Sequence, residues 1–380
     1  MRARLALPLG AAAVLAVTGF STGSPVFLVP AVLILLLIGM GAVSVAWARR
    51  TLFVQVATDS QAAHRGDEIH LSVTAGHRCP LPLAPLALQV YTGPGEEPQE
   101  LRAAQTRGGA TATLGFVARH VGFGHPGVRA CRVEDLFGLF SATVPTEGTE
   151  AALTVLPNTF DLEPLTFAPC EASLGVVSSP TEDASDPADI RAWRRGDALK
   201  KVHWKLSARR RTLLVRRFEE PTQPEALVLL DCTRPDPGID EAFTRDAMVE
   251  TAASVMAAQE GSDNDVRLPL WGRHPSELTL RMGLPLVYER LAQVDFSATE
   301  GFDRQLQDAT RRLRQVGATV VITSRLSGRM VEPLIGMRRA GPTLRIYLVS
   351  DTPNREDWQP LITRLQQAEI QVCSVTPIRE

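Results

Sequence analysis

Residues 189–220 read DIRAWRRGDALKKVHWKLSARRRTLLVRRFEE, and they hold eleven of the forty basic residues of the chain, including all three of its lysines. The chain as a whole has a formal net charge of −2. The positive charge is therefore local, and the composition gives the protein no general attraction for nucleic acid or other polyanions. Binding to a polyanion would have to involve this one segment.

The same segment has a structural pattern as well as charge. Gly196 and Asp197 predict a turn, and Asp197 is placed to cap a following helix. Apolar residues recur at helical spacing over 198–209, which predicts a short helix there. Residues 213–218 are mostly apolar or basic and predict a strand.

The run from Gly196 to Arg209 resembles the signature of the domain-of-unknown-function family 58. The matching residues are Gly196, Asp197, Lys201, Val202, His203, Trp204, Lys205, Ser207, Ala208 and Arg209. Residues 120–124 and 135–140 resemble segments that precede this signature in the family. Two positions depart from the pattern, because Trp193 stands where the family usually has Tyr and Arg195 where it often has Pro.

The resemblance implies a bacterial, membrane-anchored protein with an α/β domain related to the von Willebrand factor A fold. It also implies an association with MoxR-type AAA+ ATPases. A domain of that kind suits protein binding. We therefore expect a protein partner for the family signature, and such an ATPase is the first candidate.

Two apolar runs at the N-terminus predict a membrane anchor. They cover residues 5–20 and 25–47, and the second reaches the roughly 20 residues that span a bilayer. Arginines precede the first run and follow the second, whereas the connection between them is uncharged. The positive-inside rule then places both ends in the cytoplasm, as a hairpin of two transmembrane helices. In the alternative interpretation the first run is a signal peptide, and the bulk of the chain is still cytoplasmic.

The predicted fold class is multi-domain, with five segments along the chain. Residues 1–50 form the transmembrane hairpin, and residues 51–160 form a β-sandwich that serves as a scaffold. Residues 161–188 are rich in Pro, Ser, Glu and Asp and predict a partly mobile linker. The basic signature occupies 189–220, and residues 221–380 form the α/β domain, which the resemblance makes von Willebrand factor A-like, or Rossmann-like.

Patterning supports the two soluble domains. The sandwich region contains six short alternating runs: LFVQVAT, EIHLSVTAG, LALQVYT, ATLGFVARH, GVRACRVED and ALTVLPN. After residue 223, strands alternate with helices, which is typical of a largely parallel sheet covered on both faces. The expected helices cover residues 239–259, 284–294, 301–316, 328–339 and 358–368.

A metal site is the first chemical alternative. Asp231 and Thr233 follow the first strand of the α/β domain and resemble the opening of the metal-adhesion motif Asp-x-Ser-x-Ser. They offer two oxygen ligands, whereas Mg²⁺ needs more. The second Ser of the motif is replaced by Pro235, and a later strand ends in Ser324 and Arg325 where that fold often supplies Asp. We therefore expect no resident cofactor, with Mg²⁺ as the alternative.

Enzymatic chemistry has little support in the sequence. It contains no Walker A loop, no GxGxxG motif and no GxSxG motif. His203 and Asp197 are the one acid–base pair that the signature offers to a hydrolase. The five cysteines, at positions 79, 131, 170, 232 and 373, are widely spaced and odd in number, and they predict reduced thiols without a zinc site.

Three roles remain open for the signature. Asp197, Lys201, Trp204, Ser207 and Arg209 could form an internal network that joins the two soluble domains. Exposed basic residues could instead meet a protein partner or anionic lipid. The segment 191–217 could also bind nucleic acid, with its tryptophans stacked on bases, although near-neutral charge and membrane tethering argue against this.

The function predicted from these observations is that of a membrane-anchored, cytoplasmic-facing protein-interaction module without enzymatic activity. It would work with a MoxR-type AAA+ ATPase in assembling or maturing a cell-envelope complex. The expected partners are membrane lipid, that ATPase and other envelope proteins.

Overall fold

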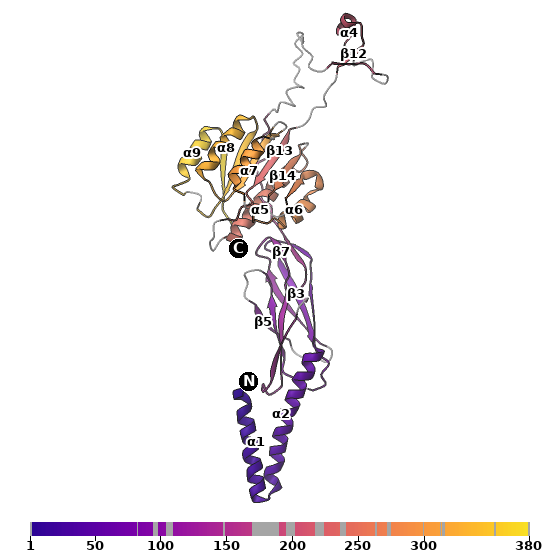
Figure 1. Cartoon of the computed structure of the whole chain (residues 1–380), viewed down its shortest axis with the longest axis vertical. Helices are drawn as coiled ribbons and strands as arrows, with labels where there is room; N and C mark the ends of the chain where they lie inside the picture. Colours follow the sequence, from indigo (N-terminus) through magenta and orange to yellow (C-terminus); the bar gives the residue numbers. More distant parts are fainter. Residues whose placement is uncertain are drawn as a thin grey trace. The chain divides into compact units, whose positions relative to one another are not determined.

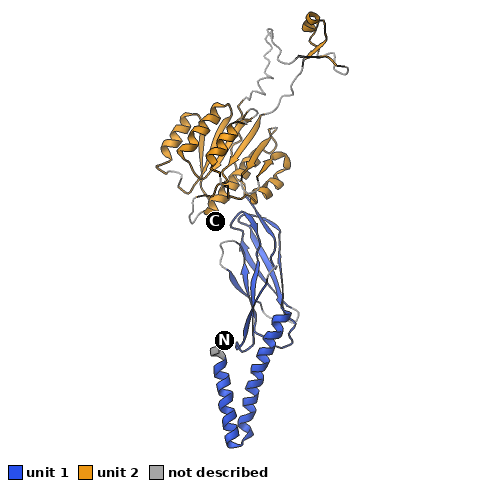
Figure 2. Cartoon of the chain, in the orientation of Figure 1, with its two compact units in different colours: residues 1–157, 380 blue, residues 158–379 orange. Residues whose placement is uncertain are grey.

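The computed structural model describes residues 2–81, 83–93, 98–103, 109–146, 149–168, 190–194, 202–216, 224–235, 241–262, 264–271, 275–298, 300–311, 313, 316–352 and 355–378. The chain divides into two compact units, residues 1–157 and residues 158–379 (Figure 2). The first unit joins the apolar helices to the β-rich region, and the second contains the α/β region.

Two long helices begin the first unit, as the apolar runs predict. Helix α1 covers Arg2–Thr22 and helix α2 covers Pro25–Thr51, and they lie side by side (Figure 1). Both are long and apolar enough to cross a membrane. The connection is shorter than the expected Ser21–Ser24, because α1 continues to Thr22 and Gly23 makes the turn with φ of 62°.

Three sheets follow the helices. One has the order β1-β3-β6, a second β5-β4-β8-β9, and a small third β2-β10-β7. All neighbours are antiparallel except β10 and β2. The strands are β1 Phe53–Thr58, β2 Ala62–His64, β3 Glu68–Gly76, β4 Leu86–Tyr91, β5 Gln99–Ala103, β6 Ala110–Val117, β7 Gly122–Gly124, β8 Gly127–Glu134, β9 Ser141–Pro145 and β10 Leu153–Leu156.

The first two sheets share one apolar core. Leu71 and Val73 of β3 lie in the same buried cluster as Leu88 of β4 and Val133 of β8, because alternate residues of each strand face inward. The end of α2 belongs to this cluster through Val45 and Ala48. The helix is thereby packed into the core of the β-rich region rather than attached to it by a free linker.

The second unit is built on a six-stranded sheet of order β15-β14-β13-β16-β17-β18. The neighbours are parallel except for β14 and β15 at one edge. The strands are β13 Glu225–Leu230, β14 Val266–Leu270, β15 Ser276–Thr279, β16 Val316–Thr323, β17 Thr343–Val349 and β18 Gln371–Val375. The helices are α5 Glu241–Ala258, the 3₁₀ turn η2 Leu280–Met282, α6 Leu284–Ala292, α7 Phe302–Thr310, α8 Gly328–Arg339 and α9 Gln359–Gln367.

Helices cover both faces of this sheet. Helices α7, α8 and α9 share one core with Leu229 of β13 and with Leu344 and Leu348 of β17. The alternate residues of β13, including Val228 and Leu230, therefore point to the opposite face, where α5 packs. Strand β16 is buried at all eight positions, which is expected of a central parallel strand.

Several element boundaries differ from the sequence prediction. The helix expected over 301–316 ends at Thr310, because Val316 already pairs with Glu225 of β13 at the start of β16. The run ELTLRM (residues 277–282), for which the sequence pattern predicts a strand, is a strand only to Thr279 and then forms the turn η2. Strands β2, β5, β7 and β9 were not predicted, since none of them is longer than five residues.

Part of the predicted linker is fixed to the second unit. Residues 161–168 contain no helix or strand, yet the Glu163 carbonyl accepts a hydrogen bond from the Arg345 guanidinium at 3.0 Å. The Ala168 N–H donates to the Gly317 carbonyl at 2.9 Å, so this segment lies along the sheet. Residues 169–188 of that prediction lie outside the described residues.

Candidate functional site

The basic signature contains a small structure of its own, formed by β11 Ile190–Ala192, α4 Trp204–Arg210 and β12 Leu214–Arg216 (Figure 1). We call these elements and the residues between them that the structure describes the signature unit. The two strands pair antiparallel, with Ala192 opposite Leu214. Val202 adds a bridge to Val215 from the other side. Val202, Leu214 and Val215 are buried, so the unit has a small apolar base.

His203 starts the helix of the signature unit. Its Nδ1 accepts a hydrogen bond from the Leu206 N–H at 3.3 Å, which makes His203 the N-cap. The predicted helix over 198–209 is therefore wrong at Val202, which is extended and bridged to a strand. The cap of α4 is His203, and Asp197, which was predicted to cap the helix, lies outside the described residues. The lone pair of His203 Nδ1 accepts this hydrogen bond, so it stabilises the start of the helix.

Ser207 fastens the helix to strand β12. Its hydroxyl accepts a hydrogen bond from the Leu214 N–H at 2.9 Å and lies 3.4 Å from the Leu214 carbonyl. The His203 N–H also donates to that carbonyl, at 2.8 Å. Ser207 and Leu214 are both buried, so water has little access to the backbone groups of Leu214. The hydrogen bonds with Ser207 and His203 satisfy these groups instead. Two signature residues, His203 and Ser207, thus have structural roles.

Other signature residues face outward. The Trp204 side chain is 60% exposed, although tryptophan is usually well buried. Lys205, Arg209 and Arg210 on the same helix are exposed, as is Arg211 at its end. Arg211 has φ of 52°, in the left-handed region that favours glycine. A bulky cationic residue is therefore present at a position where glycine would fit the backbone better.

Three predicted site residues cannot be placed. Gly196, Asp197 and Lys201 lie outside the described residues, and so does the proposed pairing of Asp197 with His203. The described part of the signature unit divides into His203 and Ser207, which hold the fold, and Trp204, Lys205 and Arg209, which lie on its surface.

The second predicted site, Asp231 and Thr233, lies at the carboxyl end of β13. The Asp231 carboxylate accepts hydrogen bonds from the Thr233 N–H at 3.0 Å and from the Thr233 hydroxyl at 2.5 Å. Its other oxygen accepts from the Thr323 hydroxyl at 2.8 Å, at the end of the neighbouring strand β16. Both carboxylate oxygens of a residue only 2% exposed are thus occupied by protein donors.

The residues around Asp231 do not fit a divalent metal. Arg325 donates to the Thr233 hydroxyl, so a fixed positive charge lies beside the oxygen that a metal would need. No group of three or more His, Cys, Asp or Glu side chains with metal-binding geometry occurs in the part of the chain that the structure describes. Mg²⁺ takes six ligands, mostly oxygens, in a nearly regular octahedron. We therefore derive no chemistry from a metal at this position.

The buried thiols are poorly suited to nucleophilic chemistry. Burial raises the pKa of the Cys232 thiol to about 12, with Asp231 and Asp295 adding to the effect and a backbone hydrogen bond at Trp271 opposing it. Burial also raises the pKa of Cys131 to about 11. Both therefore hold their protons at neutral pH, when a nucleophilic cysteine would be a thiolate. Within the described residues, the cysteines at positions 79, 131, 232 and 373 are free thiols.

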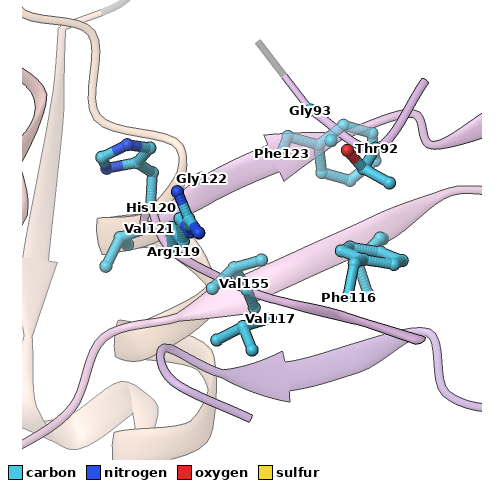
Figure 3. A pocket seen from close by; sticks show the side chains of 13 residues that line it. Thr92, Gly93, Phe116, Val117, Arg119, His120, Val121, Gly122, Phe123 and Val155 are labelled. Atoms are coloured by element: carbon cyan, nitrogen blue, oxygen red, sulfur yellow. The ribbon is translucent and has the colours of Figure 1, made fainter. Parts of the chain in front are cut away.

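Residues 120–124, which resemble a family segment, line a shallow hollow in the first unit (Figure 3). Its walls are largely apolar and include Phe116, Val155 and the half-exposed Phe123. The Phe123 ring meets the His125 ring edge-on at 5.0 Å. The only titratable side chains in the lining are those of Arg119 and His120. This lining does not place a nucleophile beside a base.

Thr323 and Arg325 were not predicted from the sequence as partners of Asp231 and Thr233. Ser324 and Arg325 were noted only because they replace an expected Asp, and Thr323 carried no signal of its own. The two strand ends are 92 positions apart in the sequence. The rule that parallel strands end at one edge of a sheet could have brought them together.

Comparison with known proteins relates a segment of the second unit to a protein family. No curated protein matches the chain. Among solved structures, Cwp6 from Clostridium difficile is similar at 9% identity with a TM-score of 0.19, over 86% of this chain and 53% of that chain. The chain thus spans about half the length of that protein, and a score so low carries no argument. Residues 189–347 match the family model described as Protein of unknown function DUF58, and this matched segment, which contains both the signature unit and the Asp231 cluster, is similar to that family.

Proposed function

We propose that this protein is a membrane-anchored interaction module that binds a partner protein through the signature unit. The observation that supports it is the exposed surface of α4, where Trp204 lies next to Lys205 and on the same short helix as Arg209. Tryptophan and arginine are the residues most enriched at the centres of protein–protein interfaces. An exposed tryptophan among cations fits a partner with an apolar pocket rimmed by carboxylates.

The partner that we propose is a MoxR-type AAA+ ATPase, acting with this protein in assembly or maturation of a cell-envelope complex. This choice follows from the family resemblance and from nothing in the geometry of α4. The protein itself would supply no catalytic residues. Its part would be to hold the ATPase, or the client of the ATPase, close to the membrane.

The fold that we propose for the second unit is that of a von Willebrand factor A-like domain. Support comes from the mostly parallel sheet β15-β14-β13-β16-β17-β18 with helices on both faces, and from Asp231 at a strand end. In this proposal the strand-end cluster is a structural substitute for the metal-adhesion site, with Arg325 providing the positive charge.

The anchor that we propose is the pair α1 and α2, with both soluble regions in the cytoplasm. The arginines at the end of α2 support this orientation, because positively charged residues next to a membrane span favour the cytoplasmic side. Trp47, which is half-exposed near that end, would lie at the membrane interface.

The test is a binding measurement with the full chain in lipid nanodiscs and the purified MoxR-type ATPase of the same organism. We expect Trp204→Ala to weaken binding by about 30-fold, the effect of removing a residue worth about 2 kcal/mol at an interface. Arg209→Ala should weaken it less. The matched control is Thr212→Ala, because Thr212 is an exposed residue of the same unit that carries no charge or ring.

Binding that is equal in wild type and in Trp204→Ala would contradict the role of α4. Absence of any binding to the ATPase would refute the choice of partner. If Trp204→Ala and Arg209→Ala instead lose binding to vesicles of anionic lipid, or to single-stranded DNA with a steep salt dependence, the surface recognises those ligands and the proposal is wrong.

A further inference from the structure

A loop of the first unit carries two large apolar side chains on its surface. It connects β8 to β9, and its Leu136 and Phe137 are 57% and 53% exposed. The loop is ordered by Asp135, whose carboxylate accepts the Phe137 N–H at 3.1 Å and the Phe140 N–H at 2.5 Å. Asp135 itself is 1% exposed, so its charge is turned inward while the apolar side chains point outward.

The same loop packs against α2. A Cβ placed on Gly41 would lie 3.2 Å from the Asp135 carboxylate and 3.3 Å from the Phe140 ring, so the absence of a side chain allows this approach. One turn further along the helix, Val45 is buried and belongs to the core between the two sheets. The loop is therefore held at a fixed height along α2.

That height can be estimated from helix geometry. Gly41 is sixteen residues after Pro25, the first residue of α2, which is about 24 Å along the axis at about 1.5 Å per residue. The hydrocarbon part of a bilayer is about 30 Å thick. If one edge of the hydrocarbon lies near Pro25, Gly41 and the loop beside it lie inside the hydrocarbon near its opposite edge. Trp47, six residues further along α2, then lies at that edge.

We propose that residues 135–140 form a third membrane contact, in which Leu136 and Phe137 enter the leaflet next to α2. The inference rests on the proposed anchoring by α1 and α2. The ligand is lipid acyl chain, because the loop adjoins the helix that would span the bilayer and because residues 136–140 carry no charge. Val43 of α2, near the same level, is 55% exposed and would face the same lipid.

The consequence is a fixed orientation of the first unit. Two helices that end in a free linker would let a soluble domain turn in any direction. A helix packed into the core and a loop inserted beside it instead resist tilting, because tilting would withdraw Leu136 and Phe137 from the apolar layer.

The test is depth-dependent quenching of tryptophan fluorescence in the full chain. Phe137→Trp is reconstituted into vesicles whose phosphatidylcholine is brominated either near the carbonyl end or near the methyl end of the acyl chain. The control is Phe123→Trp, because Phe123 is 52% exposed in the same unit. Its strand β7 lies at the end of the unit away from α1 and α2 (Figure 1). The signal of the wild type, which includes Trp47, is subtracted.

We expect the added fluorescence of Phe137→Trp to be quenched, more strongly by the bromines near the carbonyl end, and that of Phe123→Trp to be unaffected. Quenching of the wild-type signal without quenching at position 137 would overturn the inference and leave the anchoring intact. Absence of quenching in all three proteins, with the chain washed from vesicles by alkaline carbonate, would refute the anchoring itself. Equal quenching at positions 123 and 137 would also overturn the inference, because it would show contact unrelated to the loop.

Discussion

Two polar clusters of the DUF58 region use their charges in opposite ways. At the end of β13, the Asp231 carboxylate is buried and receives hydrogen bonds from Thr233 and Thr323. In the signature unit, Lys205 and Arg209 lie on the surface, and the buried polar atoms belong to the uncharged Ser207. Both clusters resemble motifs that a reader of the sequence would assign to binding.

The difference shows how to separate structural from functional motif residues. A polar group whose hydrogen bonds are satisfied within a buried cluster has little left to offer a ligand, and removing it leaves its partners without bonds. A charged group on the surface contributes little to stability and remains available. By this criterion the Asp231 cluster stabilises the sheet, whereas Trp204 and the neighbouring cations are available to a partner.

The largest effect that would test this comparison is expected for Asp231→Ala. The substitution removes the acceptor for Thr233 and Thr323 inside the protein, and we expect a loss of about 3 kcal/mol in the local stability of β13 and β16. Hydrogen exchange of the amides in β13 and β16 measures this loss of local stability in the detergent-solubilised chain. Exchange is chosen because a protein with two compact units need not unfold in a single transition.

The control for that experiment is Asp308→Ala, because Asp308 is an exposed carboxylate of α7. It should change the free energy of opening measured by exchange by no more than about 0.5 kcal/mol. A loss of local stability below about 1 kcal/mol for Asp231→Ala would mean that the hydrogen bonds from Thr233 and Thr323 do not satisfy the Asp231 carboxylate inside the protein. Saturable Mg²⁺ binding that disappears in the same variant would restore the metal interpretation.

An intermediate effect is expected for Ser207→Ala in the signature unit. The buried Leu214 N–H loses its acceptor, which costs about 1–2 kcal/mol and should loosen α4 from β12. Hydrogen exchange at the Leu214 and His203 amides would show it. Thr212→Ala is the matched control, since it removes an exposed hydroxyl from the same unit. Equal protection in the two variants would mean that Ser207 does not fasten the helix.

The smallest effect, and the only stabilising one, is expected for Arg211→Gly. Because Arg211 has φ of 52°, glycine should stabilise the end of α4 by about 0.5–1 kcal/mol. The control Arg210→Gly removes the same charge from within the helix and should destabilise it by a similar amount. The same exchange experiment distinguishes them. If both variants are destabilised, the left-handed backbone at Arg211 carries no strain.

Many of the longer elements of both units could be predicted because local patterns determine them. The helix 328–339 has its expected bounds, and β3 covers the run EIHLSVTAG, where alternation is clean. Errors occurred where a distant partner decides the outcome. Val202 fits a helix by spacing but pairs with Val215, and Val316 leaves the predicted helix because it pairs with β13.

The same reasoning applies to the site. Composition sufficed to find the basic segment, and resemblance to family motifs pointed to the signature residues and Asp231, because these are properties of neighbouring positions. They could not show that Ser207 is bonded to Leu214, or that Trp204 is exposed. Nor could they show that Asp135 turns inward to present Leu136 and Phe137.

The sequence by itself therefore determined the apolar helices, many of the longer strands and helices, and the local concentration of positive charge. Only the tertiary structure decided which polar groups are satisfied inside the protein and which face outward. The physical reason is that a hydrogen bond depends on distance in space. Asp231 receives one from Thr323, 92 positions later, because two parallel strands end side by side.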